Sequence, residues 1–114
     1  MQAQSPPPVP QPLREILSEY PELIERLQEV LNLSAARSRR APLMPLDDAI
    51  DSLENRLEKF ASEAMDELRA AESSGDSDRI RRATVKERLL SRARHKRLWI
   101  RDVEFYKYFE EGFK

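Results

Sequence analysis

The charged residues of this chain fall into two consecutive blocks of opposite sign. Residues 47–78 carry eleven acidic and three basic side chains, whereas residues 79–101 carry ten basic and one acidic side chain. A short polar run containing Gly75 joins the two blocks. Two amphipathic segments of opposite charge, separated by a turn, favour antiparallel helices that partly neutralise each other. We therefore expect an acidic/basic helical hairpin over residues 47–114.

Helices are the only regular elements that the composition favours. The chain has 114 residues, which is room for one domain and one modest core. It contains two glycines and is rich in Leu, Ala, Glu and Arg, which lose little conformational freedom in a helix. The predicted fold is all-α. It consists of a long, coiled-coil-like antiparallel hairpin, a shorter N-terminal helix packed on it, and an extended Pro-rich N-terminal tail.

Three further segments precede the hairpin. Residues 1–12 hold five of the eight prolines, which predicts a flexible tail that samples the polyproline II conformation. Residues 13–33 have apolar side chains at helical spacing, which predicts an amphipathic helix. Pro21 should kink or break this helix, with its main part ending near residue 32. Residues 34–46 are expected to form a linker.

The two helices of the hairpin have expected bounds and an expected alignment. The acidic helix should cover about residues 48–72, with Asp47 as its N-cap and Gly75 at its exit. The basic helix should begin near residue 79 and continue to about residue 109. If the two helices are antiparallel, paired positions sum to about 151, which aligns the apolar stripes and the opposite charges together. This alignment places Glu67 near Lys86.

Six of the eight aromatic residues lie in the last sixteen positions. They are Trp99, Phe105, Tyr106, Tyr108, Phe109 and Phe113. One interpretation is that they form the core beneath the N-terminal helix. The other is that Trp99, Phe105, Tyr106 and Phe109 form a partner-binding or self-association patch, because aromatic residues beside arginine are typical of interface hot spots.

The basic block supports an alternative function. Arg81, Arg88 and Arg92 share one stripe of the expected helix, away from the acidic partner helix. Such a stripe could bind the phosphate backbone of nucleic acid without sequence preference. The sequence pI of about 5.9 and the adjacent acidic helix oppose this interpretation. No helix-turn-helix or zinc-finger pattern is present in the sequence.

The residues needed for catalysis are scarce. The sequence has no cysteine, no Gly-rich loop and one histidine, His95, which lies among basic residues. We therefore expect no enzymatic activity, no metal site and no cofactor. There is no secretory signal pattern and no apolar run of about 20 residues, so we expect a cytoplasmic protein without a membrane partner.

These observations predict a small non-enzymatic protein-interaction module. It would act as an adaptor, assembly factor or inhibitor through the hairpin and its aromatic end. Its partner would be another protein or a second copy of itself. Small size and long charged helices are also common among phage-encoded accessory proteins, which is an analogy with a class of proteins rather than a site.

Overall fold

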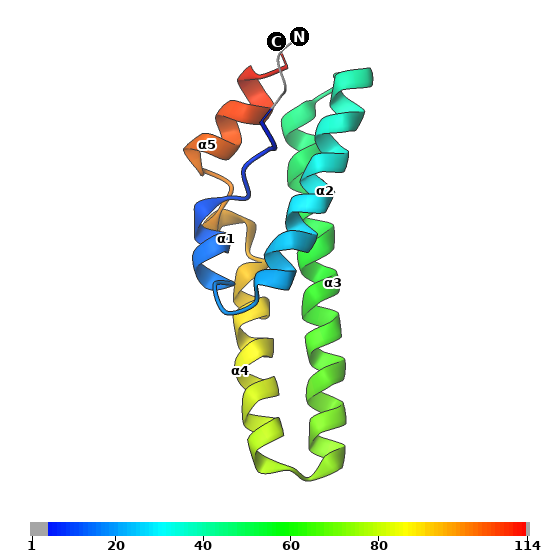
Figure 1. Cartoon of the computed structure of the whole chain (residues 1–114), viewed down its shortest axis with the longest axis vertical. Helices are drawn as coiled ribbons and strands as arrows, with labels where there is room; N and C mark the ends of the chain where they lie inside the picture. Colours follow the sequence, from blue (N-terminus) through cyan, green and yellow to red (C-terminus); the bar gives the residue numbers. More distant parts are fainter. Residues whose placement is uncertain (1–4, 114) are drawn as a thin grey trace.

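The computed structural model describes residues 5–113, and within them every regular element is helical. The all-α class predicted from the sequence is therefore confirmed. Figure 1 shows an elongated molecule, with principal extents of 55 × 23 × 22 Å, in which two long helices pack against each other. The elements in chain order are α1 (Gln11–Ile16), α2 (Pro21–Arg40), α3 (Pro45–Ser74), α4 (Ser77–Ala93), the 3₁₀ turn η1 (Lys96–Leu98), α5 (Val103–Tyr106) and the π-helical turn η2 (Lys107–Glu111).

Helices α3 and α4 run in opposite directions and are joined by a tight turn (Figure 1). Gly75 ends α3 with φ at 73°, a left-handed conformation that favours glycine, so its predicted role at the helix exit is confirmed. The Asp76 carboxylate then accepts hydrogen bonds from the backbone N–H groups of Asp78 and Arg79, at 3.0 and 3.2 Å. This cap starts α4 immediately after the turn.

The start of α3 differs from the prediction. Asp47 does not cap the helix, because α3 begins two residues earlier at Pro45. Met44 occupies the N-cap position with φ at 51°, and its side chain makes no capping bond. Proline suits the first helical position because its fixed φ matches the helix and its missing N–H leaves no donor unsatisfied. Asp47 and Asp48 therefore lie in the first turn, where the helix dipole favours negative charge.

The break at Pro21 is confirmed, but the linker after this helix is shorter than predicted. Helix α1 ends at Ile16, and Pro21 opens α2, which continues to Arg40. The predicted linker 34–46 is thus helical over its first half. The small side chains there allow this, because Ser34, Ala35 and Ser38 are all buried in the α2 face. Serine favours helix caps and turns, so composition alone predicted a linker from residue 34 onward.

The core follows the inward face of α3. Leucine residues of α2 pack along it from one side, and α4 closes it from the other. The central buried side chains are Leu23, Leu27 and Leu31 of α2, Leu53, Leu57 and Phe60 of α3, and Leu90 and Ala93 of α4. Helices α2 and α1 cover only the upper part of the α3–α4 pair in Figure 1, and the lower part consists of α3 and α4 alone.

The predicted basic helix over 79–109 is wrong in its second half. Helix α4 ends at Ala93, and the chain continues through η1 and an irregular segment to α5 and η2 at the upper end of the molecule in Figure 1. The buried Trp99 indole favours this helix end: its Nε1–H donates a 3.0 Å hydrogen bond to the Ala93 carbonyl, which has no partner within the helix. Asp102 then caps α5 by accepting from the Phe105 backbone N–H at 3.1 Å.

The Pro-rich segment also differs from the expected free tail. Residues 1–4 lie outside the described residues, and residues 5–10 pack between α2 and the C-terminal elements (Figure 1). Pro7, Val9 and Pro10 are buried. A proline-rich composition does not prevent packing, because an extended segment can bury alternate side chains and offer its carbonyls to side-chain donors.

Candidate protein-interaction surface

Three of the four aromatic residues predicted to bind a partner lie in the interior. Trp99, Phe105 and Phe109 are 0% exposed, whereas Tyr106 is 44% exposed. The Trp99 and Phe105 rings meet edge to face with centroids 6.4 Å apart, and Phe105 and Phe109 follow at 5.4 Å. This burial agrees with the core interpretation of the cluster. It leaves Tyr106 as the member of the predicted site with an accessible ring.

The arginines predicted to bind phosphate lie on the outer face of α4. Arg81, Arg88 and Arg92 are all exposed. Arg81 forms an ion pair with Asp78 at 3.1 Å on the same helix. Arg88 and Arg92 form no ion pair with any of residues 5–113. The structure thus keeps two of the three guanidinium groups available to a ligand.

The charge alignment of α3 and α4 agrees with the predicted register over α4 itself. Lys86 Nζ lies 3.2 Å from the Glu67 carboxylate, as the alignment places it. Beyond the end of α4, Lys96 contacts Glu54 at 3.6 Å. Exposed pairs of this kind contribute roughly 0–1 kcal/mol each, so they orient the helices more than they stabilise them.

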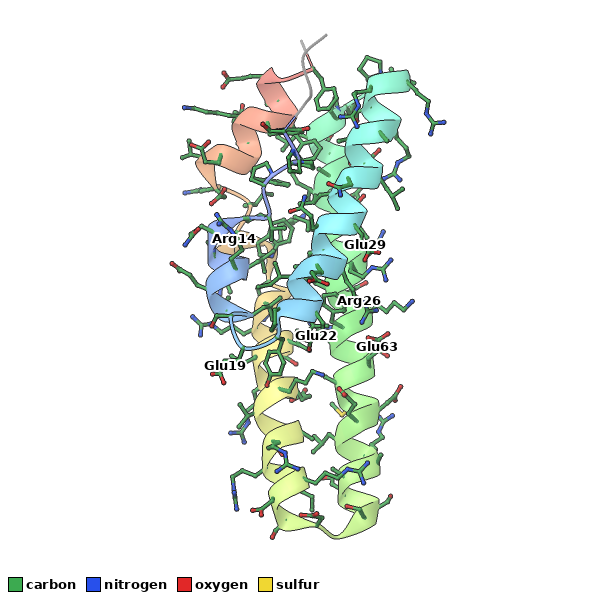
Figure 2. All side chains as sticks on the ribbon, viewed as in Figure 1. Arg14, Glu19, Glu22, Arg26, Glu29 and Glu63 are labelled. Carbon is green, nitrogen blue, oxygen red and sulfur yellow. The ribbon has the colours of Figure 1, made fainter. Side chains whose placement is uncertain are left out.

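A groove opens beside the first residues of α2, where the α3–α4 pair continues without a covering helix. We call it the distal groove; its volume is about 480 Å³. Its upper end is formed by the turn between α1 and α2, and its sides by α3 and α4 (Figure 2). Its lining residues are Glu19, Tyr20, Glu67, Arg79, Arg81, Arg82, Ala83, Val85 and Lys86.

The distal groove combines an apolar side chain with a concentration of positive charge. Val85 is 51% exposed at its edge, so α4 presents an apolar side chain to solvent there. Lys86 is held between Glu67 and the Tyr20 ring, whose centroid is 5.4 Å from Nζ. Arg79 and Arg82 are exposed and make no ion pair within residues 5–113.

A second charged contact fixes α2 directly above the distal groove. Arg26 makes two hydrogen bonds to the Glu63 carboxylate, at 3.1 and 3.3 Å, and its guanidinium lies 4.6 Å from the Phe60 ring centroid. These hydrogen bonds lower the pKa of Glu63 below its ordinary value of 4.5. Figure 2 shows Arg26 and Glu63 facing each other from neighbouring helices. The end of α2 that borders the groove is therefore anchored.

At the opposite end of α2, Arg37 and Asp48 join α2 to the first turn of α3. The Arg37 guanidinium donates to both Asp48 carboxylate oxygens, at 2.6 and 3.1 Å. The Ser52 hydroxyl donates to the Asp48 carbonyl at 2.8 Å. The hydrogen bonds from Arg37 lower the pKa of Asp48 below its ordinary value of 3.8.

This ion pair predicts a pH-dependent loss of stability. A carboxylate with a lowered folded pKa stabilises the fold above its ordinary pKa, and this contribution disappears as pH falls through the folded pKa. We expect Arg37→Met to be less stable than the natural chain by about 1 kcal/mol or less at neutral pH. The difference should shrink in urea titrations as pH decreases below 3.8, where Asp48 becomes protonated. Arg39→Met is the matched control, and an equal loss in both variants would contradict the assignment.

Other kinds of site are not found in the described part of the chain. Residues 5–113 contain no group of three or more His, Cys, Asp or Glu side chains arranged to hold a metal ion. Among their helices, none combines the length and the apolar character that crossing a bilayer requires. Comparison with protein-family models, curated proteins and solved structures found no match. The function of this chain must therefore be inferred from the geometry of its helices.

Sequence reasoning missed the distal groove because no single motif encodes it. The groove results from a difference in length, since α3 and α4 extend well below the first residue of α2. One signal was available: Pro21 fixes where the third helix begins, and that helix is shorter than the two helices of the pair. The exposed Val85 below that point then lacks a covering helix.

Proposed function

We propose that this chain is a small non-enzymatic protein-interaction module that binds an acidic amphipathic helix of a partner protein in the distal groove. The observation that carries the proposal is the half-exposed Val85 among unpaired arginines, directly beyond the end of α2. An adaptor, an assembly factor and an inhibitor all require this kind of surface. The partner-binding role thereby moves from the buried aromatic cluster to the α3–α4 pair.

The packing of α2 indicates which kind of partner helix would fit the distal groove. Its buried leucines recur every four residues at Leu23, Leu27 and Leu31, so α2 contacts the α3–α4 pair through one apolar stripe. A helix bound below α2 would continue this third layer and cover Val85. Helices that enter such grooves are recognised by apolar anchors at the same spacing.

The charge of the groove favours an acidic occupant. Arg79 and Arg82 have no carboxylate partner among residues 5–113, and Lys86 is only partly neutralised by Glu67. Complementary charge raises the association rate and excludes basic helices more than it adds affinity. The apolar contact with Val85 and Tyr20 would therefore supply much of the binding free energy, while the arginines select the partner.

The test uses a defined acidic helix as the probe. A fluorescein-labelled peptide with the sequence of residues 45–74 has the required apolar stripe and negative charge. We expect its fluorescence anisotropy to rise on addition of the full chain, and Arg82→Glu to weaken binding by about tenfold or more. Arg94→Glu is the control with the same charge change, because Arg94 is exposed nine residues after Val85 and therefore lies on the opposite side of α4.

Two further measurements separate groove binding from simple charge attraction. A scrambled peptide of the same composition lacks the apolar stripe and should not bind. Val85→Asp should abolish binding of the ordered peptide without changing helical content by circular dichroism. Equal losses for Arg82→Glu and Arg94→Glu, or equal binding of the scrambled peptide, would refute the groove. Light scattering that shows a dimer dispersed by Val85→Asp would identify a second copy as the occupant.

Nucleic-acid binding is the second candidate, and the unpaired arginines on the outer face of α4 favour it. Arg88 and Arg92 are exposed one helical turn apart on α4. Binding of a labelled duplex should weaken steeply with salt, and each of the substitutions Arg88→Glu and Arg92→Glu should reduce the salt dependence by about one phosphate contact. Tyr20→Ala, which changes the distal groove without adding charge to α4, should leave this binding unchanged, and this separates it from helix binding.

A further inference from the structure

The Pro-rich segment, residues 5–10, packs against other elements at the upper end of the molecule, away from the distal groove, and we call the surface that contacts it the channel. Figure 1 shows it between α2 on one side and α5 with η2 on the other. Four of its six residues are proline, and Pro10 has φ at −51° and ψ at 136°, close to polyproline II values. Residues that precede proline are also restricted to extended conformations, so the sequence itself favours this shape.

Side-chain donors from separate elements bind the carbonyls of alternate residues in this segment. The Tyr108 hydroxyl donates to the Ser5 carbonyl at 2.9 Å, and the Gln28 side-chain amide donates to the Pro7 carbonyl at 2.7 Å. The Arg14 Nε–H donates to the Val9 carbonyl at 3.0 Å. Proline has no N–H, so the carbonyl is the polar backbone group that such a segment can offer.

Apolar burial accompanies these hydrogen bonds. Pro7 and Pro10 are buried, and Val9 is 3% exposed as part of the same hydrophobic core as Phe105 and Phe109. Pro6 and Pro8 instead border the outer surface beside Tyr108. The channel thus combines aromatic rings, apolar contacts and convergent donors, which is the chemistry by which grooves recognise polyproline II segments.

We propose that this channel is a binding site for a proline-rich segment of a partner protein, and that residues 5–10 are its resident competitor. This site goes beyond the helix-binding groove and lies at the other end of the molecule. A partner segment with carbonyls and apolar side chains spaced like those of Pro7, Val9 and Pro10 would make the same contacts. A site of this kind accounts for the interface-like composition of the C-terminal aromatic segment, in which Phe105 and Phe109 are buried in the same core as Val9.

The covalent connection of residues 5–10 to α1 determines when a partner can bind. An attached segment acts at an effective concentration on the order of millimolar, so it outcompetes a free peptide of equal intrinsic affinity. A segment already restricted to polyproline II loses little conformational entropy on binding. Weakening the attached segment should therefore reveal binding in trans.

The experiment uses the full chain with Val9→Asp, which places a carboxylate where the resident segment needs an apolar side chain. The probe is a fluorescein-labelled peptide with the sequence of residues 5–12. We expect this peptide to bind the Val9→Asp chain about tenfold or more tightly than it binds the natural chain. The same peptide carrying Val9→Asp should not bind either protein.

A matched pair of tyrosine substitutions tests the hydrogen bond. In the Val9→Asp background, Tyr108→Phe removes the hydroxyl that binds the Ser5 carbonyl and should weaken the peptide several-fold, about the value of one hydrogen bond. Tyr106→Phe, on an exposed ring of the same segment, should have no effect. A folded Val9→Asp chain that fails to bind the peptide would overturn the proposal, as would equal effects of the two tyrosine substitutions.

A second measurement uses the natural chain, so it does not require the Val9→Asp chain to fold. Unlabelled peptide in millimolar excess, added to the natural chain, should shift the NMR resonances of the Gln28 side-chain amide and of the residue 5–10 segment as the two compete. Absence of any shift would overturn the proposal. A dimer of the natural chain that Val9→Asp disperses would also overturn it, because the occupant would then be the segment of a second copy.

Discussion

Replacing Trp99 with alanine should destabilise the fold by about 3–5 kcal/mol, a large part of the stability expected for a domain of this size. The indole is fully buried and stacks edge to face on Phe105. Its Nε1–H also satisfies the Ala93 carbonyl at the end of α4, so alanine would leave both a cavity and an unpaired buried acceptor. Urea unfolding followed by circular dichroism measures the change.

Tyr106→Ala is the control for this prediction, because Tyr106 is 44% exposed in the same segment. Its effect on the free energy of unfolding should stay within about 0.5 kcal/mol. Trp99→Phe should lie between the two, since it keeps an aromatic ring and loses the hydrogen bond. If Trp99→Ala left unfolding unchanged while dispersing an oligomer, the core assignment of the aromatic cluster would be wrong.

Phe60→Ala should produce a loss of similar size, about 3–5 kcal/mol. Phe60 is 1% exposed at the junction of α2 and α3, and its ring packs against the guanidinium of Arg26. Alanine would open a cavity and remove the aromatic face that helps to orient the Arg26–Glu63 contact. Because this contact anchors the end of α2 beside the distal groove, binding of the acidic helix should also weaken.

The unfolding measurement for Phe60→Ala needs two comparisons. Leu33→Ala removes a large apolar side chain that is 60% exposed on α2, and it should change stability by less than about 0.5 kcal/mol. Phe60→Leu keeps most of the buried volume and should cost less than half as much as alanine. Equal losses for Leu33→Ala and Phe60→Ala would show that the junction of α2 and α3 is not the core.

The sequence predicted those parts of the fold that local residues decide. Pro21 breaks the N-terminal helical pattern and Gly75 ends α3, and both positions are determined by backbone chemistry. The pairing of Lys86 with Glu67 followed from charge and apolar periodicity together. The helix boundaries depend on adjacent residues, and the Lys86–Glu67 pair joins helices connected by a short turn, so both can be predicted without further tertiary information.

Features decided by packing were not predictable in the same way. Nothing near Ala93 signals a helix end, since neither glycine nor proline occurs between Asp76 and Gly112. The end of α4 there depends on the buried position of Trp99, which periodicity does not reveal. The prolines of residues 5–10 likewise suggested a free tail, because composition does not show that Tyr108 and Gln28 bind their carbonyls.

The candidate sites illustrate the same limit. Aromatic content pointed to the C-terminal segment as a candidate site, but it did not distinguish the buried rings of Phe105 and Phe109 from the exposed ring of Tyr106. Composition correctly marked α4 as basic. Only the position of α2 shows that Val85, Arg79 and Arg82 lie in a groove without a covering helix.

The contacts of residues 5–10 impose an order on folding during synthesis. The hydrogen bond from Tyr108 joins residues 103 positions apart, and the one between Gln11 and Asp102 spans 91 positions. The α3–α4 pair needs only neighbouring segments, so it can form on a partly synthesised chain, whereas distant contacts form more slowly. Residues 5–10 therefore leave the ribosome long before their channel exists, and they stay accessible to chaperones or other proteins until Tyr108 has emerged.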